Sequence, residues 1–146
     1  MDESLRISTD RGELDLDLIH GFLAHEAYWS LGIPRATVER AVAGSLCFGG
    51  YLGREQVAFA RAITDGATFA YLADVFVLPA HRGRGYAKAL IAAVLAHPDL
   101  QGLRRISLAT WDAHDLYAKF GFAAPARPDR LMEKLNSDVY QSKTTT

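Results

Sequence analysis

Apolar and polar residues follow two different spacings along this chain, and each spacing predicts one kind of element. Apolar residues three or four positions apart are typical of one face of a helix, whereas alternation and short runs of β-branched or aromatic residues are typical of strands. Helical spacing predicts four helices, at 14–28, 34–44, 84–97 and 113–120. The strand pattern predicts about six to seven strands, at 5–8, 45–51, 56–63, 67–78, 105–110, 122–126 and 130–135.

A glycine-rich turn, Arg82-Gly83-Arg84-Gly85-Tyr86-Ala87, joins the longest predicted strand to the third predicted helix. The first amides of a helix have no intrahelical partner, so they can bind an anion at the positive end of the helix dipole. Glycines let the backbone approach a phosphate and adopt positive φ values, and the two arginines add positive charge. The turn is therefore a candidate pyrophosphate site. The alternative is a solvated basic turn that only starts the helix.

The composition indicates one soluble domain, because 146 residues with 49% hydrophobic content can close a single core. A net charge of -1 gives no global field that would attract nucleic acid or an anionic membrane. No apolar run reaches the roughly 18 residues of a membrane span, and the acidic start lacks the layout of a signal peptide. The lone Cys47 excludes an intrachain disulfide, and the histidines show no metal-ligand spacing. We therefore expect a cytoplasmic protein that uses no metal.

The turn and a second motif together resemble the GNAT superfamily of acyl-CoA-dependent N-acetyltransferases. Arg82, Gly85 and Ala87 match the family signature Arg/Gln-x-x-Gly-x-Gly/Ala, and residues 75–79 are similar to the family strand that ends in a proline. Residues 116–122, Leu-Tyr-Ala-Lys-Phe-Gly-Phe, are similar to the second family signature, Leu-Tyr-x-Lys-x-Gly-Phe. Both motifs stand in the family's order and roughly at its spacing.

The resemblance implies an α/β (α+β) GNAT fold, with a mixed central sheet of about six to seven strands that is splayed after the fourth strand and flanked by about four helices. It implies an N-acetyltransferase domain over residues 4–136. The tail, residues 137–146, is expected to be disordered because it has few apolar residues. Coenzyme A would lie in the split, with its pantetheine beside the backbone of Phe76 and Val77. The pyrophosphate would meet the turn residues Arg82, Gly83, Arg84, Gly85, Tyr86 and Ala87, where the side chain of Tyr86 would only pack.

The implied reaction is attack of a neutral amine on the thioester of acetyl-CoA, which needs a base, a polarised carbonyl and an acid for the departing thiolate. Tyr117 matches the family position that commonly serves as the acid, and a phenol with a pKa near 10 is protonated at neutral pH. The structural alternative is a tyrosine ring packed under Phe120 and Phe122. Thr110 stands where the family commonly has asparagine, so no coenzyme contact is carried over to it.

Asp74 is the leading candidate for the base, because an aspartate inside an apolar strand is unfavourable unless it faces a polar cleft or a partner. The alternative is a structural hydrogen bond to a buried neighbour. Strict alternation would place Asp74 on one face of the strand with Leu72 and Phe76. Many GNAT enzymes use a chain of waters in place of one side chain. Weaker candidates for the base are His25, Glu26 and His114.

The first two helices and their connection are expected to set the acceptor specificity, with Glu26, Tyr28 and Trp29 in the substrate site. The alternative is that both aromatic residues are ordinary core residues. Trp111 is a candidate for another lip of the cleft, and acidic residues such as Glu26 and Asp74 would suit a cationic amine better than an acidic metabolite.

Two hypotheses of different classes follow. The first is an N-acetyltransferase that moves an acetyl group from acetyl-CoA to a primary amine of a small molecule or peptide. The second is a non-catalytic sensor or interaction module that binds coenzyme A with the same fold. The intact Tyr117 favours the enzyme. Exposed edges of the late strands would make a homodimer reasonable.

Overall fold

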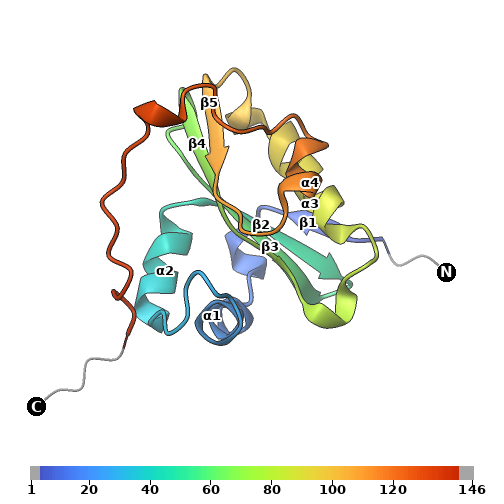
Figure 1. The fold of residues 1–146 in the computed structure, drawn as a ribbon. Coiled ribbons are helices and arrows are strands. Elements are labelled where there is room, and N and C mark those ends of the chain that lie inside the picture. Colours follow the sequence, from blue (N-terminus) through green and yellow to red (C-terminus); the bar gives the residue numbers. More distant parts are fainter. Residues whose placement is uncertain (1–3, 142–146) are drawn as a thin grey trace, which may run out of the picture.

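A mixed five-stranded sheet runs through the computed structural model, which describes residues 4–141 (Figure 1). Its strands lie in chain order. They are β1 Arg6–Ser8, β2 Leu46–Leu52, β3 Glu55–Thr64, β4 Phe69–Val77 and β5 Arg105–Leu108. The first four strands pair antiparallel, and β5 is parallel to β4. The strands β1 and β5 therefore form the two edges of the sheet.

Four α-helices cover the two faces of the sheet, with α1 and α2 on one side and α3 and α4 on the other (Figure 1). They are α1 Leu16–His25, α2 Arg35–Ala43, α3 Tyr86–Ala96 and α4 His114–Ala118. One core cluster joins α1 and α2 to the sheet through residues such as Phe22 and Phe59. A second cluster joins α3 and α4 to the other face through Leu90 and Tyr117. No helix within residues 4–141 has the length and the apolar character to cross a membrane.

The four predicted helices and the first five predicted strands are confirmed, but the sheet has five described strands and not six to seven. The two late strands, predicted at 122–126 and 130–135, are not formed. Pro125 has no amide to donate to a ladder, and Pro128 starts the short 3-10 turn Pro128–Arg130. This turn is closed by an ion pair between Arg127 and Asp129. Prolines in a strand-like apolar pattern thus explain the error.

The chain after this turn runs outside the sheet and past α2 (Figure 1). Near its end, Tyr140 packs against the cluster of α1 and α2. A Cβ built on Gly32, whose φ is 83°, would lie 2.6 Å from the Tyr140 carbonyl oxygen, so only glycine fits at position 32. Of the tail for which we expect disorder, residues 137–141 form a turn and a bend, and 142–146 lie outside the described residues.

Candidate active site

The ladder between β4 and β5 ends before β4 does. Backbone pairing runs from Phe69 opposite Arg105 to Leu72 opposite Leu108 and stops there. On its other side, β4 stays paired with β3 as far as Val77. The backbone of residues 73–77 is therefore open on the β5 side. The two strands part where the resemblance implies a binding site for pantetheine.

A β-bulge changes the direction of the side chains of β4 along this open edge. Two residues of β4, Asp74 and Val75, stand opposite Ala60 of β3 alone. Asp74 has a φ of 54°, which is the one positive φ at a described residue other than glycine. As a result, Leu72 packs in the cluster of α3 and α4, whereas Phe76 packs in the cluster of α1 and α2. The prediction that Asp74 shares a face with both is wrong, because the extra residue breaks the alternation.

Both carboxylate oxygens of Asp74 are engaged. Trp29 donates from Nε1 to Oδ1 at 2.8 Å, and Arg61 donates from Nε to Oδ2 at 2.9 Å. The side chains of Asp74 and Arg61 are 11% and 15% exposed, so solvent screens this ion pair little. Arg61 also donates to the hydroxyl of Ser45 at 3.1 Å. The carboxylate is therefore neutralised by Arg61, and it fixes the orientation of Trp29.

The turn between β4 and α3 has the backbone conformation that its glycines predict. The φ values are 81° at Gly83 and 79° at Gly85. A Cβ at either position would meet no atom within 4 Å, so space is open above both glycines. Gly85 is the N-cap of α3, and no described side chain caps the helix there. Together with the exposed Arg82 and Arg84, the backbone amides at the start of α3 fit a diphosphate.

Side chains on both sides of this turn are held in place. Arg82 donates from Nε to the Val77 carbonyl oxygen at 3.0 Å, which ties the turn to the end of β4. Tyr86 is 8% exposed within the cluster of α3 and α4, so its ring packs as expected. Phe76 stacks on Phe22 with ring centroids 4.0 Å apart. Phe76 can therefore offer a ligand its backbone only.

Tyr117 on α4 is nearly buried. Its side chain is 8% exposed, and its ring meets Phe122 edge to face with centroids 5.8 Å apart. Burial, with a smaller effect of the nearby Tyr28, raises the pKa of Tyr117 to about 12. Tyr117 therefore remains a neutral phenol that can donate a hydrogen bond at neutral pH, while its ring also packs in the core.

Three aromatic side chains from two distant loops meet beside Asp74. Tyr28 lies edge to face with Trp29 at 5.1 Å and with Trp111 at 4.7 Å between ring centroids. The backbone amide of Trp111 donates to the Tyr28 hydroxyl at 3.2 Å. The structure thus joins two predicted substrate residues to the predicted lip of the cleft. Glu26, in contrast, is exposed at the C-cap of α1.

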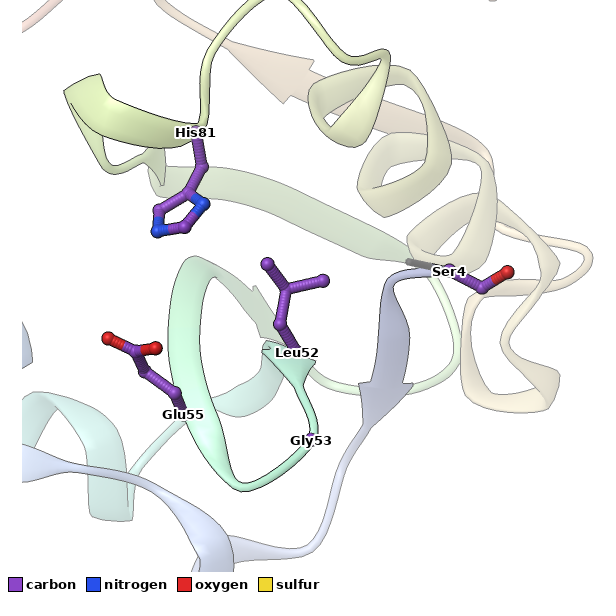
Figure 2. Close-up of a pocket in the computed structure, with 5 residues that line it drawn as sticks. All are labelled: Ser4, Leu52, Gly53, Glu55 and His81. Carbon is purple, nitrogen blue, oxygen red and sulfur yellow. The ribbon is translucent and has the colours of Figure 1, made fainter. Parts of the chain in front are cut away.

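A hollow of about 400 Å³ opens at the hairpin between β2 and β3 (Figure 2). Figure 2 shows His81 pointing from the segment after β4 toward Leu52 and Glu55. Its Nδ1 atom is buried and has no hydrogen-bond partner among the described residues. The hollow is lined by Ser4, Leu52, Gly53, Glu55 and His81. None of these is a predicted site residue, so the hollow is distinct from the open edge of β4.

Comparison with known proteins establishes the family. The model of the acetyltransferase (GNAT) family matches residues 39–122, which is more than half of the chain. This chain belongs to the GNAT acetyltransferase family. The matched residues include the open edge of β4, the glycine turn and Tyr117, so both sequence motifs lie inside the family match.

Individual proteins that are similar to this GNAT protein agree with the family assignment. The crystal structure of a putative GNAT-family acetyltransferase from Xanthomonas campestris pv. campestris is 58% identical with a TM-score of 0.93, covering 95% of this chain and 98% of that one. A Gibberella zeae protein named putative acetyltransferase is 35% identical over 135 residues, which are 77% of this chain and 75% of that protein. A Staphylococcus aureus protein of unknown function, described as a probable acetyltransferase, is 22% identical with a TM-score of 0.72, covering 91% of this chain and 99% of that one. This last likeness shows the fold alone.

Sequence reasoning missed Arg61 of this GNAT protein. The available signal was an arginine inside an apolar strand, next to the strand that carries Asp74.

Within residues 4–141, no group of three His, Cys, Asp or Glu side chains could hold a metal ion. The roles of the individual residues and the cytoplasmic location stay predictions.

Proposed function

We propose that this GNAT protein transfers an acetyl group from acetyl-CoA to a primary amine of a small molecule or peptide, by direct attack in a ternary complex. The observation that carries the proposal is the succession of an open strand edge at 73–77 and a positive-φ glycine turn at 82–87, packed in one cluster with Tyr117. The strand edge offers hydrogen bonds to pantetheine, the turn offers amides and arginines to the pyrophosphate, and Tyr117 offers a hydroxyl to the sulfur.

In the proposed step, the amine nitrogen attacks the thioester carbonyl carbon, the carbon–sulfur bond breaks, and the sulfur leaves as a thiolate. The ammonium proton passes to a base or to water. Tyr117, whose pKa is raised to about 12, donates a hydrogen bond to the sulfur as negative charge develops there. A thiol has a pKa of about 8.5, well below that of Tyr117, so complete proton transfer from the phenol to the thiolate is unfavourable and Tyr117 stabilises the thiolate by hydrogen bonding.

Asp74 stays the predicted base, but its contacts support a positioning role better. Accepting a proton would weaken the ion pair with Arg61 and leave that guanidinium poorly compensated in a site that is 15% exposed. As a positioning residue, Asp74 would hold Trp29 against the open edge of β4.

The variant Asp74→Asn distinguishes these two roles. Asparagine tolerates the positive φ and still accepts one hydrogen bond, so a positioning role predicts a less than tenfold loss of kcat, a raised KM for the amine and a lower melting temperature. A kcat loss of 100-fold or more would instead establish Asp74 as the base.

The sensor hypothesis predicts binding without turnover. Release of free thiol from acetyl-CoA, followed on adding a panel of amines and peptides, separates it from the proposed enzyme. Amine-dependent release supports the enzyme. Saturable acetyl-CoA binding with no release across the whole panel supports the sensor.

We also propose that residues 122–135 pair two copies of the chain. One support is the outer side of the edge strand β5, which pairs with no other strand within residues 4–141. The other is the apolar side chains of this segment, of which Leu131 is 57% and Met132 97% exposed. Light scattering should find a dimer that the double variant Leu131→Glu/Met132→Glu turns into a monomer. The variant Ile63→Glu, at another 42% exposed apolar position, is the control. A monomeric parent protein, or a double variant that stays dimeric, would contradict the proposal.

A further inference from the structure

Three aromatic residues, Tyr28, Trp29 and Trp111, combine exposure with fixed positions, and we call them the aromatic cluster. They are 48%, 44% and 73% exposed. The core aromatic residues Phe22 and Phe59 are at most 5% exposed. The cluster is thus a solvent-facing surface and not part of either core, which removes the alternative that Tyr28 and Trp29 are ordinary core residues.

Each ring of the cluster is fixed by a contact from another element. Trp29 is hydrogen-bonded to Asp74 of β4, and Tyr28 accepts a hydrogen bond from the amide of Trp111, 83 residues away. Both ring pairs meet nearly at right angles, at 88° and 80°. Edge-to-face pairs of this kind leave ring faces free for a further partner, and a preordered surface binds with less entropy loss.

The charges around the aromatic cluster select the chemistry of that partner. The Asp74 carboxylate behind it is compensated by Arg61, so it offers no free anionic site. Exposed acidic residues stand close to the cluster in the sequence: Glu26, the C-cap of α1, precedes Tyr28, and Asp112 and Asp115, the latter in the first turn of α4, follow Trp111. These exposed carboxylates attract a cation, and aromatic faces accept both rings and ammonium groups.

We propose that the aromatic cluster binds the acceptor and that the acceptor is a primary amine carrying an aromatic ring. This inference rests on the proposed acetyltransferase function. The aromatic ring of the acceptor stacks on the aromatic cluster, above all on its most exposed member, Trp111. Trp29 is hydrogen-bonded to Asp74 on the open edge of β4, so the cluster lies beside the strand edge where we propose that the pantetheine of acetyl-CoA binds.

Binding can be measured directly, because the only two tryptophans of the chain, Trp29 and Trp111, both belong to the aromatic cluster. Tryptophan emission is recorded while the protein is titrated with phenethylamine, with n-butylamine, or with a tripeptide that begins with phenylalanine, each with and without coenzyme A. Burial and stacking of a ring should make phenethylamine bind at least about tenfold more tightly than n-butylamine. The comparison of phenethylamine with the tripeptide tells a small aromatic amine from a peptide end.

Substitutions assign the effect to the aromatic cluster. Trp111→Ala should lower the affinity for phenethylamine at least about tenfold and leave the affinity for n-butylamine unchanged, and the emission of Trp29 still reports binding in this variant. Trp111→Phe should keep most of the affinity for phenethylamine. Phe69→Ala, at a 40% exposed aromatic residue at the far end of β4, is the matched control and should change neither.

Equal affinity for phenethylamine and n-butylamine, or unchanged phenethylamine affinity in Trp111→Ala, would overturn the inference. Turnover separates it from the proposed function. Aromatic-selective binding without acetylation would support the inferred binding site and contradict the proposed enzyme. Acetylation of both amines with equal KM would support the enzyme and overturn the inferred site.

Discussion

Replacing Gly85 with glutamate is expected to weaken acetyl-CoA binding at least about 100-fold, which corresponds to about 2.7 kcal/mol. Gly85 has a φ of 79° at the N-cap of α3, where a side chain costs about 1–2 kcal/mol of backbone strain. The new carboxylate would also stand in the open space above the turn, where we propose that the pyrophosphate binds. Repulsion between this carboxylate and the pyrophosphate of acetyl-CoA would weaken binding in addition to the effect of the backbone strain.

The control for this variant is Gly102→Glu. Gly102 has a φ of 71° and equally open surroundings, but it lies between the 3-10 turn Pro98–Leu100 and the start of β5, away from the turn at Gly85. Calorimetric titration with acetyl-CoA should therefore show normal affinity for Gly102→Glu, and thermal unfolding should be similar for the two variants. Retained affinity in Gly85→Glu would remove the pyrophosphate from this turn.

Replacing Tyr117 with phenylalanine is expected to lower kcat about 100-fold, because one preorganised hydrogen-bond donor to a developing negative charge is worth roughly 10²- to 10³-fold in kcat. The ring and its packing against Phe122 are kept, so the affinity for acetyl-CoA should change less than about twofold. Since burial raises the pKa of Tyr117 to about 12, the parent enzyme should keep its rate up to about pH 10, where this phenol is about 1% ionised. Steady-state kinetics across pH test both expectations.

Tyr51→Phe is the matched control. Tyr51 of β2 is 1% exposed, burial raises its pKa to about 12, and its hydroxyl has no hydrogen-bond partner among the described residues. This variant loses the same atom at another buried tyrosine, so kcat should not change. If Tyr117→Phe also leaves kcat unchanged, Tyr117 has no part in the chemistry. If it loses acetyl-CoA affinity and keeps kcat, Tyr117 acts in binding.

Local patterns predict most of the fold because helices and hairpins are set by neighbouring residues. The apolar stripe of α3, for example, is readable in Leu90 and Val94, and both are buried as it requires. The prediction of two late strands was wrong because an apolar pattern does not show whether a partner strand is available. Pro125 and Pro128 also make strand pairing in this segment unfavourable.

Those parts of the candidate site that depend on a single short segment of the sequence could be predicted, and those that depend on contacts between distant segments could not. The positive φ values of Gly83 and Gly85 follow from residue type in a recognisable motif. The bulge at Asp74 does not, because it depends on the register of β4 against β3. The contact of Tyr28 with Trp111 joins residues 83 positions apart, and only the folded sheet brings them together.

The central claim, acetyl transfer from acetyl-CoA to an amine, is tested most directly by mass spectrometry of the products formed from isotope-labelled acetyl-CoA and phenethylamine. We predict one labelled acetyl group on the amine for each thiol released, with both products absent when the protein is omitted. Saturable acetyl-CoA binding without labelled product from any amine or peptide of the panel, or thiol release with the label recovered as acetate, would contradict the account.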